Sequence, residues 1–302
     1  MSYVKPEQVV EAAVAAGKAK AEAGNLQLLM RGVLGGAILA CATTLALAAT
    51  GQTTGIVGAI VFPLGFVIIV ILGLELVTGA FAVVPLAVYR RQATMADMLR
   101  NYAVVILGHL VGCLGYAAAY VAVITRMGTS DADPMVATLV NLAEAKTLAY
   151  AELGGAGFAL VFIKAVLCNW MVTLGVVMAM TSTSTGGKIL AMWLPITCFF
   201  AQGFEHAVVN MFVIPAGMML GADVGVGDWW LWNQAPVLLG NFVGGVLLTG
   251  FALYLAHWNT TAAGPLLELQ EERGHGLAEQ LESELEEELE TMASAQGEPA
   301  KR

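Results

Sequence analysis

The feature that most constrains this chain is an apolar run from Gly32 to Tyr89 in which Glu75 is the only charged side chain. A membrane-spanning helix needs about 20 apolar residues, so the run is too long for one span. A short polar turn at residues 49–55 divides it. The second part, about 56–89, is still too long for one straight helix, and we expect that helix to be interrupted.

A polar island marks the expected interruption. Residues 73–79 read Gly-Leu-Glu-Leu-Val-Thr-Gly, and residues 203–211 read Gly-Phe-Glu-His-Ala-Val-Val-Asn-Met inside a second long apolar run. A charged side chain at bilayer depth costs about 2.5–3.5 kcal/mol on insertion scales, so such residues are rare and usually functional. Because both islands begin Gly-x-Glu, we predict that they are two halves of one permeation site.

Composition places the whole chain in the membrane class. Its 302 residues are 58% hydrophobic and only 12% charged, with a mean hydropathy of +0.75. The pattern predicts an all-α membrane protein with six transmembrane helices, and a polar loop at residues 126–152. The expected spans are about 28–49, 56–89, 101–125, 154–181, 189–220 and 233–257.

Polar segments flank the predicted channel domain, residues 27–258. Residues 1–26 are alanine-rich and predict a cytoplasmic amphipathic helix on the membrane surface, acting as a gate at the pore mouth or as a simple anchor. This polar start also argues against a cleaved signal peptide. Residues 259–302 form an acidic cytoplasmic tail, in which leucines at every fourth position fit either tail pairing in an oligomer or a solvated charged segment.

The spans divide into two similar halves. Each half has a plain span, an over-long interrupted span and a plain span, and three spans per half mean that the halves insert in opposite orientations. Paired interrupted segments of this kind indicate a transport site near the membrane midplane. Lys and Arg precede span 1 and follow spans 2 and 4, whereas the loops after spans 1 and 5 have none. By the positive-inside rule, both termini are expected in the cytoplasm.

His206 is the expected proton-handling group, because the unperturbed pKa of imidazole lies near physiological pH. A small monovalent anion can cross an apolar constriction after accepting a proton or while facing an imidazolium. Thr78, Asn169 and Asn210 are expected to be neutral hydrogen-bond donors that hold the anion without trapping it.

The remaining polar residues at this depth receive other roles. Glu75 and Glu205 are expected to cap backbone N–H groups where the helices break, since a pore carboxylate would repel anions. Lys164 either attracts anions or else snorkels or pairs with a glutamate between subunits. His109, alone on an apolar helix, is expected to be a packed core residue.

Five motifs resemble, in order, those of the formate/nitrite transporter family. They are GLELVTG at 73–79, AEAK at 143–146, KAVLCNWMVTLGVVMAM at 164–180, GFEHAVVNMFVIPAG at 203–217 and LLGNFVGG at 238–245. The resemblance covers roughly residues 5–258. It implies an aquaporin-like protomer with its own pore, assembled as a pentamer in the bacterial cytoplasmic membrane. It also implies passage of formate, nitrite or hydrosulfide, and the residues after Met211 are more similar to the formate branch.

The resemblance also implies which residues line the pathway. They are His206, Thr78, Asn169, Asn210, Phe62, Phe66, Phe199 and Leu76. In this set Thr78 matches the threonine of the Ω-loop, His206 the central histidine, and the three phenylalanines the constrictions. Phe66 stands where the formate-type pattern usually has leucine, and Lys146 fits the lysine at the outer mouth.

Other functional classes fit the sequence less well. An intramembrane enzyme using His206 and Glu205 would need a nucleophile or metal set, and the sequence contains neither H-E-x-x-H nor G-x-S-x-G. An aquaporin-type pore for neutral solutes would carry paired N-P-A motifs, which are absent, and no basic patch suggests nucleic acid. We therefore predict non-enzymatic anion transport without metal or cofactor. Formate, nitrite and hydrosulfide stay open as substrates, as do channel and proton-coupled modes.

Overall fold

The computed structural model describes residues 3–257, and over that range it is helical except for loops and one antiparallel bridge between Tyr3 and Ser182. The predicted all-α class is confirmed, and the predicted acidic tail lies outside the described residues. The helices are α1 (Pro6–Glu22), α2 (Asn25–Gln52), α3 (Gly55–Val61), α4 (Pro63–Ile71), α5 (Val77–Tyr89), α6 (Met95–Ile124), α7 (Pro134–Ala145), α8 (Leu148–Glu152), α9 (Gly155–Met180), α10 (Thr185–Ala201), α11 (Ala207–Met219), α12 (Val226–Trp229) and α13 (Ala235–Val243). Two π-helical segments, η1 (Trp230–Gln234) and η2 (Gly244–Phe251), continue α12 and α13.

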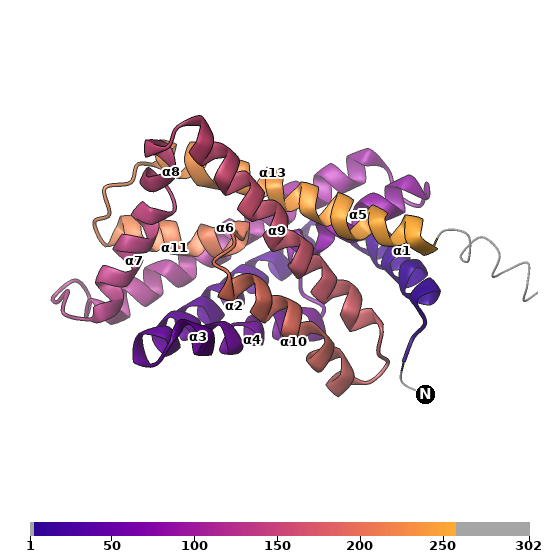
Figure 1. The fold of residues 1–302 in the computed structure, drawn as a ribbon, viewed down its shortest axis with the longest axis horizontal. Helices are drawn as coiled ribbons and strands as arrows, with labels where there is room; N and C mark the ends of the chain where they lie inside the picture. Colours follow the sequence, from indigo (N-terminus) through magenta and orange to yellow (C-terminus); the bar gives the residue numbers. More distant parts are fainter. Residues whose placement is uncertain (1–2, 258–302) are drawn as a thin grey trace, which may run out of the picture. The chain divides into compact units, whose positions relative to one another are not determined.

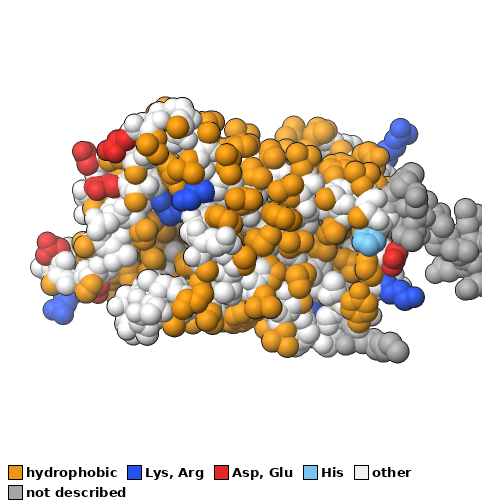
Figure 2. Space-filling model, viewed as in Figure 1, with side chains coloured by type: hydrophobic (Ala, Val, Ile, Leu, Met, Phe, Trp, Pro, Cys, Tyr) orange, Lys and Arg blue, Asp and Glu red, His pale blue; other side chains and the backbone are white. Residues whose placement is uncertain are grey.

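Within residues 3–257, four helical segments are long and apolar enough to cross a membrane. They are Asn25–Gln52, Met95–Ile124, Gly155–Met180 and Val226–His257. Four shorter apolar helices are Gly55–Ile71, Val77–Tyr89, Thr185–Ala201 and Ala207–Met219. The 13 residues of α5 or of α11 rise about 20 Å, less than the hydrocarbon thickness of about 30 Å. On the face drawn in Figure 2, hydrophobic side chains cover the middle, and most of the charged ones lie toward its left and right ends.

Both polar islands lie where the chain leaves the helical conformation. Helix α4 ends at Ile71 and α5 begins at Val77, whereas α10 ends at Ala201 and α11 begins at Ala207. The first glycine of each island, Gly73 or Gly203, adopts a φ of +63°, a left-handed conformation that strains residues with a Cβ.

The two helix ends close in the same way. The Leu74 N–H donates to the Ile69 carbonyl at 2.9 Å, and the Phe204 N–H donates to the Phe199 carbonyl at 3.3 Å. A bond across five residues with a left-handed glycine before the donor is the Schellman ending of a helix. The sequence therefore stops both helices by the same local device.

Glycines let the long helices approach closely. On α6, a Cβ added to Gly108 or Gly112 would clash with backbone atoms of α2. In the second half, a Cβ on Gly240 or Gly244 would clash with backbone carbonyls of α9. Small residues at such contacts are typical of helix packing in membranes, where lipid competes equally for larger apolar side chains.

Helix α1 lies within the predicted helical segment, residues 1–26, and its apolar side is covered by protein. Its apolar residues Val9, Val10 and Val14 are at most 4% exposed, and Gly17 lies against the carbonyl of Val83 in α5. The apolar side of α1 therefore packs on the protein, beside α5 (Figure 1). The periodicity identified the apolar side correctly, but it carries no information about which surface covers that side.

The predicted loop at 126–152 also needs correction, because it contains α7 and α8. Helix α7 starts at Pro134, with the Asp133 carboxylate accepting from the Met135 N–H at 2.8 Å. It packs along α11 through Gly217, whose missing side chain leaves room for Leu139 and Ala143. Mixed charges made this segment look like a loop, although its buried side is apolar.

Candidate functional site

The first turns of α5 and α11 are held by side chains from other helices. The Val77 N–H donates to Nε2 of His109 on α6 at 3.1 Å. The Ala207 N–H donates to Oδ1 of Asn241 on α13 at 2.9 Å. Each half-helix thus begins with an N–H bonded to the third long helix of its own half. These two acceptors, and not Glu75 or Glu205, cap the breaks.

His206 and Thr78 join the two islands. Nε2 of His206 lies 3.1 Å from the Thr78 hydroxyl oxygen, and both residues are buried. Nδ1 of His206 accepts the Val209 N–H at 3.3 Å. Because Nδ1 accepts, the ring hydrogen lies on Nε2 and is donated to Thr78, which leaves the hydroxyl hydrogen of Thr78 available.

Aromatic rings cover one side of His206. The Phe199 ring stacks on the imidazole, with 5.6 Å between centroids and 22° between planes. Phe62 meets Phe199 edge to face at 5.6 Å and stacks on Phe200 at 4.1 Å. Phe66 is 2% exposed and lies closer to the α1 side, where it lines a cavity together with Leu76. The face of the imidazole that contacts Phe199 is therefore covered by apolar rings.

Asn169 and Asn210 use their amide hydrogens within the protein. Nδ2 of Asn169 donates to the carbonyls of Thr78 at 3.0 Å and Asn241 at 2.6 Å. Nδ2 of Asn210 donates to Glu205 and to Asn233, each at 2.8 Å. The Oδ1 atoms of both asparagines are buried without a hydrogen-bond partner among the described residues. The prediction that Asn169 and Asn210 donate hydrogen bonds to the anion is therefore wrong for this arrangement. Their free groups are the Oδ1 atoms, which are acceptors.

Each island carboxylate bonds a lysine. The Lys20 ammonium lies 2.7 Å from Glu75, and the Lys146 ammonium lies 2.8 Å from Glu205. Both glutamates are at most 2% exposed, and a buried carboxylate is tolerated when a cation and hydrogen bonds compensate its charge. The tyrosine hydroxyl of α8, Tyr150, also donates to Glu205 at 2.8 Å. The expected capping role of the carboxylates is replaced by ion pairing.

Lys164 reaches the same network indirectly. Its ammonium donates to the Tyr150 hydroxyl at 3.2 Å and lies 5.7 Å from the centre of that ring. Within this chain, its contact is therefore the Tyr150 side chain.

Sequence reasoning missed several residues of this network. They are Lys20, His109, Tyr150, Asn233 and Asn241. A comparison of the two halves could have found most of them, since each half supplies a lysine before its first long helix and a capping side chain on its third. His109 is buried and hydrogen-bonded in the core, as expected, and only its bond to the Val77 N–H had no local signal in the sequence.

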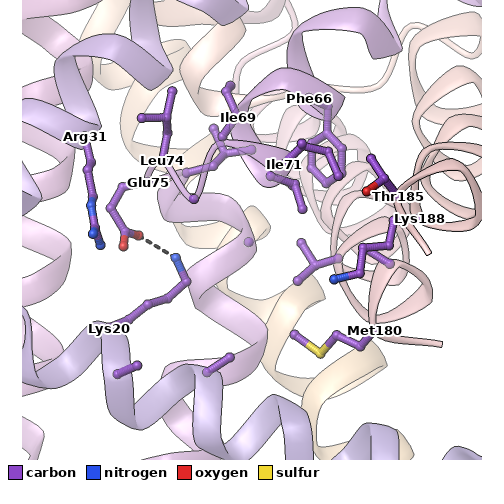
Figure 3. A pocket seen from close by; sticks show the side chains of 18 residues that line it. Lys20, Arg31, Phe66, Ile69, Ile71, Leu74, Glu75, Met180, Thr185 and Lys188 are labelled. Carbon is purple, nitrogen blue, oxygen red and sulfur yellow. Dashed lines mark hydrogen bonds and ion pairs between the residues drawn. The ribbon is translucent and has the colours of Figure 1, made fainter. Parts of the chain in front are cut away.

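A cavity of about 490 Å³ opens beside Glu75 on the α1 side of the molecule. It is lined by residues of α1, α2, α4, α5, α9 and α10, and Figure 3 shows Lys20 reaching from α1 to the carboxylate. Among residues 3–257, no group of three or more His, Cys, Asp or Glu side chains could hold a metal ion.

Comparison with known proteins gives a consistent result. The family model "Formate/nitrite transporter" matches residues 7–255. A "Probable formate transporter" of Methanothermobacter thermautotrophicus is 36% identical over 262 residues, which cover 82% of this chain and 94% of that protein.

Two solved structures share the fold. A structure described as "FNT family ion channel" has a TM-score of 0.68 at 26% identity, covering 82% of this chain and 98% of the other. A "Pentameric formate channel with formate bound" has a TM-score of 0.64 at 23% identity, covering 78% and 98%. With apolar helices long enough to cross a membrane and a family match along nearly its whole length, this chain is a helical membrane protein of the formate/nitrite transporter family.

Proposed function

We propose that this protein conducts small monovalent anions, formate first, through a pore in each protomer centred on His206 and Thr78. The contact between these two residues carries the proposal, because it joins the islands of both halves between the starts of α5 and α11. Helix N-termini carry partial positive charge, which attracts an anion. Nitrite and hydrosulfide are the alternative substrates within the family, and we propose no enzymatic reaction.

We further propose six membrane crossings in two inverted three-helix repeats. In this arrangement α3, α4 and α5 together make the second crossing, and α10 and α11 make the fifth. The shared glycine conformation, helix ending and lysine–glutamate pair of both breaks support the repeat. We place both termini in the cytoplasm of a bacterial cell, and we propose a homopentamer because one structure of the same fold is described as pentameric.

The hydrogen-bond directions suggest how a proton enters the mechanism. His206 donates to Thr78, so the Thr78 hydroxyl can donate its own hydrogen to an anion. The unpartnered Oδ1 atoms of Asn169 and Asn210 can accept the O–H of the protonated acid. The apolar rings around the site favour the neutral acid, because a bare charge is costly there. We therefore propose that the anion takes up a proton from the water on the side of entry, crosses the site as the neutral acid and releases the proton on the other side, so that transport rises as pH falls.

Uptake of labelled formate into proteoliposomes tests this function. The full-length chain should take up formate faster as the external pH falls, and nitrite or hydrosulfide should compete according to their own affinities. His206→Phe keeps an aromatic ring but removes both nitrogens, so it should reduce uptake and change its pH profile. Uptake by His206→Phe that matches the parent protein at every pH would refute the role of His206, and no formate uptake by the parent would refute the substrate.

A further inference from the structure

A segment that occurs twice in the sequence places His109 and Asn241 at equivalent positions. Residues 107–113 read Leu-Gly-His-Leu-Val-Gly-Cys, and residues 239–245 read Leu-Gly-Asn-Phe-Val-Gly-Gly. Each segment lies on the third long helix of its half, the first on α6 and the second across α13 and η2. The two halves therefore use different residues at this one position, an imidazole in the first and an amide in the second.

The two side chains make the same pair of contacts. Nε2 of His109 accepts the Val77 N–H at 3.1 Å, and Nδ1 lies 2.8 Å from the Gly32 carbonyl of α2. Oδ1 of Asn241 accepts the Ala207 N–H at 2.9 Å, and Nδ2 donates to a carbonyl of α9 at 2.8 Å. Each side chain therefore ties the start of a half-helix to the backbone of the first long helix of its half.

His109 can make both contacts only while its ring is neutral. Because the Val77 N–H donates to Nε2, the ring hydrogen lies on Nδ1 and is donated to Gly32. Protonation adds a hydrogen to Nε2, which then faces the Val77 N–H as donor against donor, and the bond is lost. His109 is fully buried, and Gly35 of α2 packs against its ring, so the imidazole stays directed at this N–H. The amide of Asn241 has no such second state.

Basic groups surround His109 and oppose a positive charge on it. Lys20 on α1 and His206 of the second island lie near enough to interact electrostatically with His109. Arg31 precedes Gly32 on α2 and stands near Lys20 (Figure 3). The start of α5, which His109 caps, carries the partial positive charge of a helix N-terminus. A protonated ring would therefore be repelled from three sides.

The other groups around His109 do little to compensate such a charge. The carboxylate of Glu75 already bonds Lys20 at 2.7 Å. Helices α5 and α11, which also pack against α6, contain no Asp, Glu, Lys or Arg. On α6 itself, Cys113 lies one turn further along and directs its thiol to the Gly36 carbonyl. The contacts of His109 therefore favour the neutral ring throughout.

We propose that His109 is a positioning residue for the contact between Thr78 and His206, and that it acts only while its ring is neutral. Thr78 follows Val77 directly, and its hydroxyl lies 3.1 Å from Nε2 of His206. Neutral His109 fixes the first turn of α5 and thereby the Thr78 hydroxyl, whereas protonated His109 releases that turn. The effect on transport rests on the proposed function, but the release of α5 does not.

Formate uptake by proteoliposomes across a range of pH tests the effect on transport. Uptake by the parent protein should rise as pH falls, reach a maximum and then decline where His109 becomes protonated. His109→Asn copies the second half of the protein, because it keeps one acceptor and one donor but cannot titrate. It should retain uptake near neutral pH and lose the acid-side decline. His109→Leu removes the cap and should lower uptake on the order of tenfold at every pH.

His109→Gln carries the same amide further from the backbone and replaces His109→Asn if that variant folds poorly. His257→Asn is the matched control, because His257 belongs to neither island nor to α6, and its pH profile should equal that of the parent. An acid-side decline that persists in the amide variants, or a parent profile without any decline, overturns the pH dependence. Parental uptake by His109→Leu overturns the positioning role.

Hydrogen–deuterium exchange tests the release of α5 without any transport. In the parent, the peptide covering residues 74–81 should lose protection at acid pH, after correction for the intrinsic exchange rate. In His109→Asn it should stay protected. The peptide covering residues 204–211, capped by Asn241, is the internal reference and should stay protected in both. Unchanged protection of 74–81 at the pH where parent uptake declines overturns the proposal. A protein that takes up no formate but shows this release overturns the proposed transport and leaves the pH-dependent cap standing.

Discussion

At the scale of single residues, buried charges in this protein are distributed as pairs. Glu205 accepts hydrogen bonds from Lys146, Tyr150 and Asn210, so its carboxylate is fully engaged. Removing one partner of a buried pair leaves an uncompensated charge, whereas removing both partners leaves none. The Lys146–Glu205 attraction itself therefore adds little to stability. Removing only one of the two residues is costly, because the other charge is then left buried without a partner.

We predict that Lys146→Met lowers the stability of the purified protein by about 3–5 kcal/mol, because it leaves the Glu205 charge without its cation. The Lys146→Met/Glu205→Gln double variant should recover much of that loss. Thermal unfolding in detergent measures both, and a double variant no more stable than Lys146→Met would contradict this account. Lys18→Met, which disturbs only an exposed pair with Glu22, should unfold at the parent temperature.

Thr78 provides the second test at this scale. Thr78→Val keeps the shape of the side chain but removes the hydroxyl that meets Nε2 of His206. Formate uptake should fall on the order of tenfold, since a hydrogen bond at the centre of the proposed pathway is lost. Thr138→Val is the control, because its hydroxyl bonds only the Pro134 carbonyl of its own helix and is exposed. Equal uptake by Thr78→Val and Thr138→Val would remove Thr78 from the pathway.

At the scale of elements, glycines decide where helices stop and how closely they pack. Gly73 and Gly203 have no neighbour within 4 Å of an added Cβ, so only their backbone conformation excludes other residues. Gly112 is the opposite case, because an added Cβ would clash with the backbone of Val33 on α2. The same residue type therefore acts by two distinct physical mechanisms in neighbouring helices.

The helix ends can be tested by adding one methyl group. Gly203→Ala should destabilise the protein by about 1–2 kcal/mol, the cost of a left-handed conformation for a residue with a Cβ. Gly51→Ala, which also has open space around it but no positive φ, should have no such cost. Their unfolding temperatures should differ accordingly, and equal temperatures would show that the break at 203 tolerates any residue.

The helix contact can be tested in the same way on α6. Gly112→Ala should destabilise the protein by about 1–3 kcal/mol or more, because the α2 and α6 backbones must separate. Gly115→Ala adds the same methyl group on the same helix, where nothing lies within 4 Å. We expect a lower yield of folded protein for Gly112→Ala alone, and equal yields would contradict the close contact.

At the scale of the whole molecule, many large apolar side chains of residues 3–257 are exposed. Its exposed leucines include Leu107, Leu160, Leu194, Leu239 and Leu247. In a membrane these side chains contact lipid or neighbouring subunits, and the charged ends lie outside the hydrocarbon (Figure 2).

The proposed homopentamer is tested by native mass spectrometry of the protein released from detergent. The expected main species is five copies of the 31.6 kDa chain. A predominantly monomeric or dimeric species under conditions that retain formate uptake would contradict the pentamer. The same measurement on Lys18→Gln, a change on an exposed side chain, should give the parent distribution.

Much of this protein could be predicted from local sequence. The apolar runs and the left-handed glycines are properties of short segments, so they predicted the all-α class and the positions at which the chain leaves the helix. The residues around His206 could be predicted as well, because polar side chains inside an apolar run are conspicuous. Their hydrogen-bond roles could not, and Asn169 and Asn210 were assigned as donors although both amides are already bonded.

Partner choice was decided only by the tertiary structure. Glu75 bonds Lys20, Val77 is capped by His109, and neither pairing has a local signal. These contacts form because glycine faces bring α2, α5 and α6 close together and because α1 folds back over α5. The sequence alone therefore determined where the chain must be polar inside the membrane. Only the packing of helices distant in sequence determined which side chain pairs with each buried charge and which acceptor bonds each N–H at a helix start. The reason is that these partners depend on which helix backbones can approach one another.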